Sequence, residues 1–393
     1  MGAGGSGLSL RLAHVFPTDR VAYLMRARLM RLQELGFAVS IICGDRGYGG
    51  RLRECGLEVI QIPFARELAP WTDLRCLWAL RRELGSGHYD IAHSHNPKGT
   101  LLGPVAGRLA GVKAVVHTVH GFLFNENSRG MHRLAAEGAE RWCARWSDDL
   151  FFQSREDFDY ARAHRYKKPE RLHWIGNGID ERRFAPSLHP GAREEKRAEL
   201  GLGADDLVVG MVTRLVREKG CVEFFQMAAH IIQKWPQVRF LMVGIPEEKD
   251  QSDAVDPEGL MREYGVADRC IALEHRTDMP ELYAAMDLLT LPSYREGIPR
   301  AVIEAGAMAL PVVVSAIRGC REVVVEGETG LLFPLKDVPA FAAAVDRLLS
   351  DAELRHKLGR AGRERVMAHY TEARTTERIV ECYRRCLAEG RRS

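Results

Sequence analysis

The chain has 393 residues, 46% of them hydrophobic and 28% charged, which describes a globular protein too long for one ordinary core. Its net charge of +3 gives no electrostatic basis for strong nucleic-acid binding, and no apolar run approaches the ~18 residues needed to span a bilayer. The 9 cysteines are scattered and free of CxxC pairs. We therefore expect a reducing compartment in which most of them, Cys382 and Cys386 included, are small buried apolar residues.

The N-terminus shows no positively charged segment followed by an apolar one, so we expect no signal peptide. The string "GAGGSG" at residues 2–7 matches the dinucleotide-binding pattern G-x-G-x-x-G. That pattern binds pyrophosphate only where a strand precedes the glycines and a helix follows them. Here the glycines come before the first predicted strand, and we interpret them as a flexible leader.

Apolar runs of strand length alternate with helical patterns from residue 10 onward. Helical patterns cover residues 20–36 and 74–87. The strand-like runs are residues 10–16, 38–44, 58–64, 90–95, 114–120 and 149–154. Because each run is largely apolar, this order predicts a parallel sheet with helices on both faces. A loop around Gly176 closes this first domain, which we place at residues 1–180.

The same alternation restarts after a connector at residues 183–205, which is rich in Pro, Gly and charge and contains one short helix. The second set of strand-like runs is 207–213, 238–244, 270–275, 287–293, 311–316 and 330–334. A second domain is therefore predicted at residues 181–370, followed by a helix at 371–393 for which packing on the first domain is one option. The predicted fold is α/β, with two facing doubly wound domains and a ligand cleft between them, at the carboxyl ends of the strands.

Two glutamates stand in the stretch "SYREGIPRAVIEA" at residues 293–305. Pro299 suits the first turn of a helix, whose dipole and first backbone amides would bind an anion. Glu296 would lie beside that anion and Glu304 about one helical turn further on. A nucleotide sugar, with its diphosphate between two hydroxyl-bearing sugars, fits such a site. A capped surface loop followed by an ordinary helix explains the pattern equally well. The backbone amides that would bind the anion are those of Gly297, Ile298, Arg300 and Ala301.

The stretch "VVGMVTRLVREKG" ends a strand near Thr213 and then supplies Arg214 and Lys219. Two cations at the carboxyl end of a strand would stabilise the negative charge of a leaving nucleoside diphosphate. The alternative is a solvated charged turn, which is common for such runs.

Together, the E-x7-E pattern, "TRLVREKG" and "RGCREVVVEGETGLLFP" resemble glycosyltransferase family 4, most sharply over residues 207–334. The resemblance implies the GT-B fold, with two facing Rossmann-like domains. It also implies a retaining enzyme that moves a hexose or N-acetylhexosamine from a nucleotide sugar, with UDP expected as the nucleotide. The implied acceptor is a glycan or a polyprenyl-diphosphate-linked sugar in the synthesis of cell-surface polysaccharide or glycoconjugate. Neither a cofactor nor a metal is expected.

The resemblance also assigns roles to individual residues. Glu296 would contact donor-sugar hydroxyls, with Gly297, Ile298 and Pro299 around the sugar and diphosphate, and Glu304 would bind the ribose. Arg214 and Lys219 would bind the diphosphate, and Arg276 in "EHRTDMPEL" would lie near the uracil. His120 in "HTVHGF" would face the donor sugar as a positioning or polarising residue. Catalysis would then rest on charge stabilisation and on positioning.

One loop departs from the family pattern. Many members have a Gly-Gly pair after the first strand, where this chain reads "FPTDRVAY". A backbone contact from this loop to the diphosphate is therefore in doubt. Thr18 or Arg20 would replace it, or the loop would serve the acceptor.

The acceptor side is less defined. In "HSHNPKG", His93, His95, Asn96 and Lys98 follow a strand, and an acceptor or phosphate site and an ordinary polar loop explain them equally well. Basic and aromatic residues share the helical pattern at 20–36, with Arg20, Arg26, Arg28 and Arg31, and the pattern at 74–87, with Trp78. Such helices suit either an anionic membrane surface or ordinary packing on their own sheet. We therefore expect a cytoplasmic protein, with peripheral attachment to the inner face of the membrane as a hypothesis.

Three alternatives are weaker. Glycosyltransferases of the other main fold bind a metal ion through a D-x-D motif, and this chain has such a motif at Asp157–Asp159. Here the motif fits the first turn of a helix, where acidic residues are favoured. A UDP-sugar epimerase shares the two-domain fold, but no convincing acid–base pair stands out. A dinucleotide-dependent oxidoreductase would need glycines in a different place.

Overall fold

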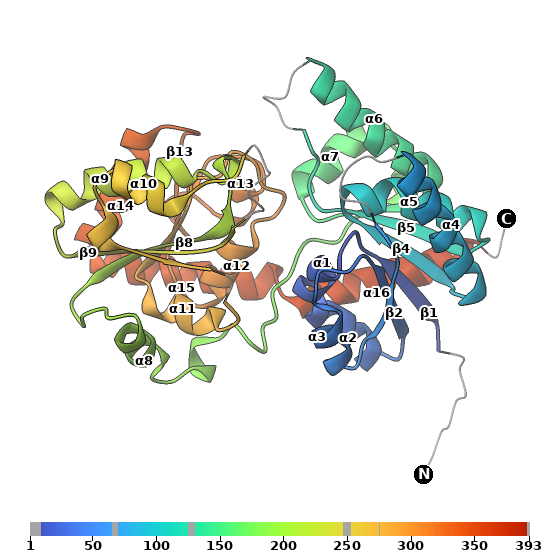
Figure 1. Cartoon of the computed structure of the whole chain (residues 1–393), viewed down its shortest axis with the longest axis horizontal. Coiled ribbons are helices and arrows are strands. Elements are labelled where there is room, and N and C mark those ends of the chain that lie inside the picture. The colour runs from blue at the N-terminus through green and yellow to red at the C-terminus, as the bar shows by residue number, and fades with distance from the viewer. Residues whose placement is uncertain (1–8, 65–69, 125–129, 247–252, 275, 391–393) are drawn as a thin grey trace, which may run out of the picture. The chain divides into compact units, whose positions relative to one another are not determined.

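The computed structural model describes residues 9–64, 70–124, 130–246, 253–274 and 276–390. Within these ranges, the side chains of residues 96–100, 132, 245–246 and 389–390 lie outside the description. The chain forms an N-terminal domain (Met1–Asn177 with Glu372–Ser393) and a C-terminal domain (Gly178–Thr371). Each contains one parallel sheet with helices on both faces, so the predicted fold class of two doubly wound α/β domains is confirmed (Figure 1).

The sheet of the N-terminal domain has seven parallel strands in the order β3-β2-β1-β4-β5-β6-β7. Six of them match the predicted runs. The seventh, β7, was predicted as part of the closing loop, but it pairs with β6 from Leu150 and Leu172 onward. Its three residues include a histidine and directly precede the predicted loop around Gly176, so only this pairing reveals it. The strands are β1 (Arg11–Val15), β2 (Ala38–Cys43), β3 (Glu58–Gln61), β4 (Ile91–His95), β5 (Ala114–Val119), β6 (Asp149–Phe152) and β7 (Leu172–Trp174).

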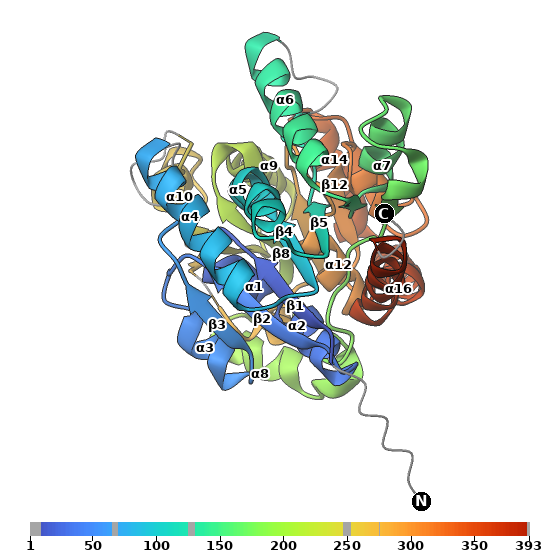
Figure 2. The ribbon, with the colours of Figure 1, turned by 90° about the vertical axis from the view of Figure 1, so that its right-hand side faces the viewer.

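Alternate residues of each strand face opposite layers of helices. Leu12 of β1 packs in the cluster that contains α2 and α16, whereas Ala13 packs in the cluster that contains α4 and α5. The predicted helix at 20–36 is divided at Met25 into two helices. On the first face lie α1 (Asp19–Leu24), α2 (Arg26–Glu34), α3 (Gly49–Glu54) and α16 (Glu372–Gly390). On the second lie α4 (Pro70–Ser86), α5 (Asn96–Leu109), α6 (Gly130–Trp146) and α7 (Arg155–Ala163), where α5 contacts both α4 and α6 (Figure 2).

The C-terminal helix α16 returns to the N-terminal domain and is held there by a buried ion pair. The Arg28 side chain in α2 is 1% exposed, and its Nε donates to Glu372 Oε2 over 2.9 Å. The same guanidinium donates to Asn177 Oδ1 over 3.3 Å. Tyr383, further along α16, is fully buried between the helix and the sheet and bonds to His93. The helix therefore completes one layer of this domain.

The C-terminal domain has a six-stranded parallel sheet in the order β10-β9-β8-β11-β12-β13, and all six strands match the predicted runs. Leu289 faces α11 and α12, whereas Leu288 faces α9 and α14. The strands are β8 (Leu207–Leu215), β9 (Val238–Pro246), β10 (Cys270–Leu273), β11 (Leu288–Leu291), β12 (Val312–Ser315) and β13 (Leu331–Phe333). The α-helices are α8 (Ala192–Glu199), α9 (Cys221–Lys234), α10 (Pro257–Glu263), α11 (Met279–Ala285), α12 (Arg300–Ala307), α13 (Cys320–Val323), α14 (Val338–Ser350) and α15 (Ala352–His369). Short 3-10 turns are η1 (Pro169–Arg171), η2 (Pro186–Leu188), η3 (Arg217–Lys219) and η4 (Ala267–Arg269).

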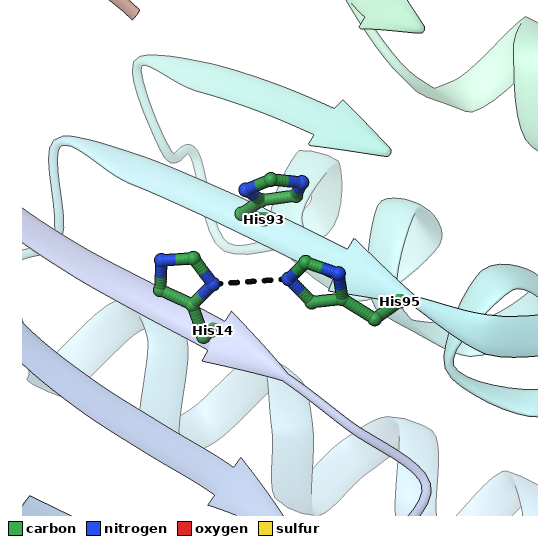
Figure 3. Close-up of side chains that lie close together, drawn as sticks. All are labelled: His14, His93 and His95. Atoms are coloured by element: carbon green, nitrogen blue, oxygen red, sulfur yellow. Dashed lines mark hydrogen bonds between the residues drawn. The ribbon is translucent and has the colours of Figure 1, made fainter. Parts of the chain in front are cut away.

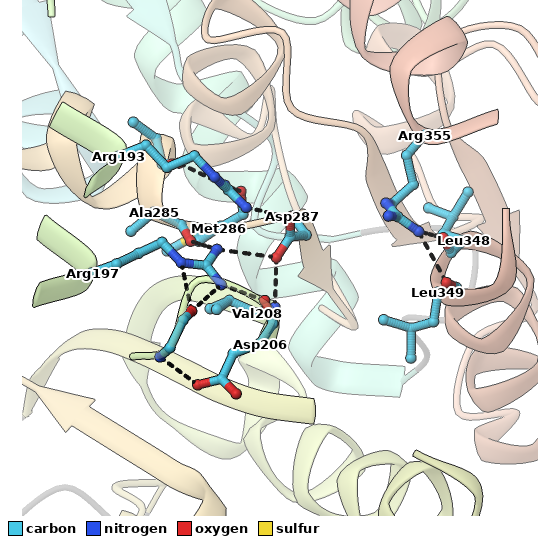
Figure 4. Close-up of polar contacts among 12 residues, drawn as sticks. Arg193, Arg197, Asp206, Val208, Ala285, Met286, Asp287, Leu348, Leu349 and Arg355 are labelled. Carbon is cyan, nitrogen blue, oxygen red and sulfur yellow. Dashed lines mark hydrogen bonds and ion pairs between the residues drawn. The ribbon is translucent and has the colours of Figure 1, made fainter. Parts of the chain in front are cut away.

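The predicted connector contains α8, which is fastened to the amino end of β11. Arg193 Nη2 lies 2.7 Å from Asp287 Oδ1, and Arg197 Nη1 donates to the carbonyl of Ala285 over 3.2 Å (Figure 4). Asp287 Oδ2 also accepts from the amide of Val208, which starts the burial of β8. These contacts occupy the end of the sheet opposite the carboxyl ends of the strands.

Each sheet reverses its strand order once. In the N-terminal domain the reversal lies between β1 and β4, and in the C-terminal domain it lies between β8 and β11. The loops that leave two such strands diverge to opposite sides and open a crevice at their carboxyl ends, which is where doubly wound sheets bind ligands. The topology therefore points to these two places for functional residues.

We expect Glu372→Gln to lower the free energy of unfolding by about 3–5 kcal/mol, because it leaves the buried Arg28 charge without its counter-ion. The matched control is Glu381→Gln on the same helix, which breaks an exposed pair with Arg385 and should change stability by no more than about 0.5 kcal/mol. Urea unfolding followed by circular dichroism measures both. Equal losses in the two variants would contradict the importance of the buried pair.

Candidate functional site

In the C-terminal domain, the loops after β8 and β11 are bonded directly to each other. Lys219 Nζ donates to Glu296 Oε1 over 2.7 Å and to the carbonyl of Arg295 over 3.2 Å. One residue earlier, Glu218 accepts from Arg295 Nε over 2.6 Å, and its carbonyl accepts from the amide of Tyr294. The structure thus brings together two residues, Lys219 and Glu296, that the sequence analysis selected from separate motifs.

The Glu296 carboxylate is held by one of its two oxygens. Oε1 accepts from Lys219 and from Ser293 Oγ, each over 2.7 Å. Among the described residues, no hydrogen bond to Oε2 is present. The side chains of Lys219 and Glu296 are 12% and 14% exposed, so a low local dielectric strengthens their attraction. A fixed carboxylate with one oxygen available suits hydroxyl recognition.

Two glycines allow this close approach. Gly220 has φ +74°, and a Cβ there would lie 2.1 Å from the carbonyl oxygen of Pro292. Gly319 has φ +80°, and a Cβ there would lie 1.8 Å from the carbonyl oxygen of Gly297. Any side chain at either position would displace the loop that carries Glu296. Both glycines and Ser293 lie in stretches that contain predicted site motifs, but no role was predicted for any of the three. The positive φ needed at each glycine is not visible from sequence alone.

The helix after Glu296 begins one residue later than predicted. Pro299 is the N-cap of α12, with extended ψ of 107°, and not its first helical residue. Ile298 is buried, and no side chain caps the helix. Glu304 follows Arg300 by four residues, one turn along. The first turn of α12 thus presents backbone amides in the region where the sequence analysis placed an anion.

The Glu304 carboxylate is also fixed by neighbours. Its Oε2 accepts from the hydroxyl of Tyr283 over 3.0 Å, and its Oε1 lies 3.4 Å from Arg300 Nη2. Burial and the Glu304 charge raise the pKa of Tyr283 well above its ordinary value, so the tyrosine remains a hydrogen-bond donor. Each oxygen of the carboxylate therefore has one neighbouring donor, and the group stays oriented.

The other two predicted donor residues are not among these contacts. Arg214 is the penultimate residue of β8, which extends two residues beyond the predicted end at Thr213, and its side chain is exposed. Arg276 pairs with Asp278 over 2.5 Å and with Glu199 over 2.8 Å. Hydrogen bonds from Arg276 lower the pKa of Asp278, so the carboxylate stays charged and available to the guanidinium. Arg276 belongs to a cluster of its own, fastened to α8.

In the N-terminal domain, the predicted histidines meet where β1, β4 and β5 end. His95, the last residue of β4, is 1% exposed, and its Nδ1 lies 3.1 Å from Nε2 of His120, which follows β5. His93 is also buried and bonds to Thr118 Oγ1 over 2.6 Å. The predicted acceptor residues Asn96 and Lys98 begin α5, and their side chains lie outside the described residues.

The loop after β1 is organised by a residue that the sequence analysis missed. Asp19 is fully buried, and its carboxylate accepts from the backbone amides of Arg46, Tyr48 and Gly49 over 2.8–2.9 Å. Thr18 is the N-cap of α1 without a side-chain cap, and the half-buried Arg20 follows it. Nothing in the sequence indicates that Asp19 is buried, because it stands in a polar stretch and its hydrogen-bond partners lie in the loop after β2.

The D-x-D string begins a helix, as predicted. Ser154 caps α7 by accepting from the amide of Asp157 over 3.3 Å, and Asp157 accepts from the amide of Phe122 over 3.1 Å. Asp159 instead pairs with Arg155 one turn earlier. The two carboxylates therefore serve separate partners.

Two family models match consecutive parts of the chain. Residues 192–365 match the model for glycosyl transferases group 1, and residues 21–178 match the model for a glycosyl transferase 4-like domain. The two matches fall on the C-terminal and N-terminal domains, respectively.

Several characterised or solved proteins are similar over almost their whole length. The chain is 29% identical over 380 residues to the UDP-Gal:alpha-D-GlcNAc-diphosphoundecaprenol alpha-1,3-galactosyltransferase of Escherichia coli, covering 95% of this chain and 96% of that protein. It is 26% identical to the capsular polysaccharide biosynthesis glycosyltransferase CapM of Staphylococcus aureus, covering 97% and 98%. The crystal structure of Anabaena HepE in complex with UDP-glucose matches with a TM-score of 0.80 at 20% identity, covering 95% and 99%, and so shares the fold. These relatives do not favour the epimerase or oxidoreductase alternatives.

We expect Gly319→Ala to destabilise the C-terminal domain, because the new Cβ overlaps the carbonyl oxygen of Gly297. The matched control is Gly327→Ala, which has φ +71° but nothing within 4 Å of an added Cβ. The control should lose about 1–2 kcal/mol from the left-handed backbone alone, and Gly319→Ala a further ~1–3 kcal/mol from overpacking. Urea unfolding of both variants measures the difference, and equal losses would contradict the close approach.

Proposed function

Because this chain belongs to the glycosyltransferase family that those two models describe, we propose that it moves a hexose or N-acetylhexosamine from a UDP-sugar to a glycan or polyprenyl-diphosphate-linked sugar, with retention of configuration. The observation that carries the donor part of the proposal is the joined pair of loops after β8 and β11, where Lys219, Ser293 and Glu296 are in contact. This is the position in a doubly wound sheet at which ligands bind.

In this proposal, Glu296 accepts hydrogen bonds from donor-sugar hydroxyls and Glu304 accepts them from the ribose. Both carboxylates are held by neighbouring side chains, which supports recognition by orientation and not by flexible contact. The backbone of Gly297, Ile298 and Pro299 surrounds the sugar and diphosphate. Arg276 would lie near the base, and its pairing with Asp278 and Glu199 holds its guanidinium in one orientation for that purpose.

Positive charge at the leaving diphosphate comes from Arg214, Lys219 and the start of helix α12. Lys219 donates two of its three N–H groups to the loop after β11, which fixes the ammonium group before any ligand binds. A charge held in place in this way stabilises a developing negative charge without reorganisation. We propose on this basis that the reaction needs no metal ion, and that His120 positions the donor sugar.

The acceptor part of the proposal rests on the named relatives. The Escherichia coli relative acts on a diphosphoundecaprenol-linked sugar, and CapM belongs to capsular polysaccharide biosynthesis. A similar acceptor for this chain is consistent with those names. We assign Arg20, Asn96 and Lys98 to the acceptor side as part of the proposal, since they follow β1 and β4. His95 was predicted with them, but it is buried and both of its nitrogens bond other histidines, so its part there is to position neighbouring residues.

We also propose peripheral attachment of the N-terminal domain to the inner face of the membrane. Among the described helices, none is long and apolar enough to cross a bilayer. The predicted helix at 20–36 is a poor candidate for surface contact, because Arg28 is buried in its ion pair. Helix α4 is a better one, since Trp71 and Trp78 are 81% and 57% exposed and stand two turns apart on one face. Helix α6, which like α4 contacts α5, also carries exposed residues: Met131, Leu134, Arg141, Trp142 and Arg145.

We expect UDP to raise the unfolding temperature of the protein more than GDP, ADP or NAD does. A ligand at a hundred times its dissociation constant stabilises by ~2.7 kcal/mol. Glu304→Gln should weaken the shift, because an amide accepts less strongly from ribose hydroxyls than a carboxylate does. Glu353→Gln, at an exposed position in α15, is the control and should leave the shift unchanged. Stabilisation by NAD alone would refute the donor assignment.

We expect the protein to float with anionic liposomes. Changing both Trp71 and Trp78 to Ser should abolish this flotation, because it removes the exposed aromatic side chains of α4. The control changes Met30 and Leu35 to Ser, since these exposed residues lie on or directly after α2, on the other face of the same sheet. Two outcomes at physiological salt would refute attachment through α4. The first is that the tryptophan variant still floats, and the second is that the unmodified protein does not float.

A further inference from the structure

Three histidines in the N-terminal domain form a hydrogen-bonded chain from the interior to its surface. His14 Nδ1 lies 3.0 Å from His95 Nε2, and His95 Nδ1 lies 3.1 Å from His120 Nε2 (Figure 3 shows the first link). His14 and His95 are each 1% exposed, whereas His120 is half-buried. The chain therefore connects a fully buried imidazole to the one that the proposed function places beside the donor sugar.

The rings are held in position by stacking and by a fourth histidine. The ring of His95 lies 4.4 Å from that of Phe16 and 4.1 Å from that of His93, centroid to centroid. His93 uses both of its nitrogens, one toward Thr118 and the other toward the hydroxyl of Tyr383 in α16. With these neighbours in place, His95 cannot turn its ring to exchange its two nitrogens without breaking the packing.

Burial keeps the two inner rings neutral. It lowers the pKa of His14 to about 3, with the positive charge of Arg28 as a further cause, and it lowers the pKa of His95 well below its ordinary value. A neutral imidazole carries one N–H and one bare nitrogen. Each link between two such rings therefore needs an N–H from one ring and a bare nitrogen from the other.

With neutral rings, the chain has only two consistent arrangements of protons. In the first, His14 Nδ1–H donates to His95, His95 Nδ1–H donates to His120, and the proton of His120 is on Nδ1. In the second, His120 Nε2–H donates to His95, His95 Nε2–H donates to His14, and the proton of His14 is on Nε2. The tautomer of His120 is thus coupled to that of His14 through His95.

The environment of His14 Nε2 separates the two arrangements. This nitrogen is buried, and it has no hydrogen-bond partner among the described residues. The second arrangement would bury an unpaired N–H there, and orphaned N–H groups are rarer in proteins than unused acceptors. Arg28 Nη1 is a second buried nitrogen without an acceptor among the described residues, and the Arg28 charge disfavours protonation of His14 to the cation.

We propose that His14 and His95 are positioning residues that keep neutral His120 in the tautomer with its proton on Nδ1, so that it meets the donor sugar as a hydrogen-bond donor. The identity of that ligand rests on the proposed function, whereas the tautomer does not. A histidine held in this way polarises or orients a sugar oxygen and is a poor general base at that nitrogen.

The same residues have a second interpretation as a metal site. Among the described residues, His14, His93 and His95 form the group of side chains whose ligand atoms lie within 4.8 Å of one another. Their nitrogens are, however, largely committed to each other, to Thr118 and to Tyr383, and the nearby Arg28 charge opposes a cation. The proton arrangement explains the contacts without breaking any of them.

The experiment is a long-range ¹H–¹⁵N correlation spectrum of the full-length protein labelled with ¹⁵N-histidine, in which protonated and bare ring nitrogens resonate far apart. The His120 signals are identified by their loss in His120→Gln. We expect His120 to show a protonated Nδ1 and a bare Nε2 in the unmodified protein. A bare Nδ1 with a protonated Nε2 would overturn the proposal.

Two variants of equal size test the coupling. In His14→Asn the amide nitrogen replaces Nδ1–H, so the His120 pattern should stay as in the unmodified protein. In His14→Asp the carboxylate only accepts, so the two His120 nitrogens should exchange their protonated and bare signals. An unchanged His120 in a folded Asp variant would refute the coupling. Should that variant not fold, the unmodified protein and the Asn variant still decide the tautomer.

Two further readouts complete the test. Stoichiometric zinc, cobalt or nickel that is bound by the purified protein and lost in His14→Asn would overturn the proposal in favour of a metal site. The spectra need no substrate, so failure of sugar transfer with the expected tautomer would refute only the proposed function. Transfer with the opposite tautomer would refute only the role of the histidine chain.

Discussion

Parallel strands end at one edge of a sheet, and this constraint places the chemistry of both domains. In the C-terminal domain it brings the loop after β8 against the loop after β11, so that Lys219 reaches Glu296 although 77 residues separate them. In the N-terminal domain it brings the ends of β1, β4 and β5 together, and with them His14, His95 and His120. In each sheet the residues gather beside the strands at which the order reverses.

The two sites differ in how the protein stabilises their polar groups. The C-terminal site uses charge against charge near the surface, with Lys219, Glu296 and Glu304 each anchored by a neighbour. The N-terminal site instead uses neutral groups, because burial disfavours the charged forms of His14, His93 and His95, and hydrogen bonds link these rings to one another, to His120 and to hydroxyl groups. A charged group suits electrostatic work on a diphosphate, whereas a neutral chain fixes the direction of a hydrogen bond.

The C-terminal helix links this neutral site to the stability of its domain. Helix α16 contributes Glu372 to the buried pair with Arg28 and Tyr383 to the contact with His93. Arg28 thus fixes the helix, and its charge also lowers the pKa of His14. Helix α16 therefore supports residues from α2 and β4, which lie far from it in the sequence.

The sequence by itself determined the two α/β domains, twelve of the thirteen strands and the short list of charged residues, because apolar runs of strand length and helical spacing are local properties. Only the tertiary structure decided which of those residues meet. It joined Lys219 to Glu296, kept Arg276 in a separate cluster, and buried Arg28, for which the sequence allowed either a membrane surface or packing on the sheet. It also revealed the roles of Asp19, Ser293, Gly220 and Gly319. Burial, backbone approach and pairing between distant loops depend on packing, and packing between residues far apart in a chain leaves no local pattern in its sequence.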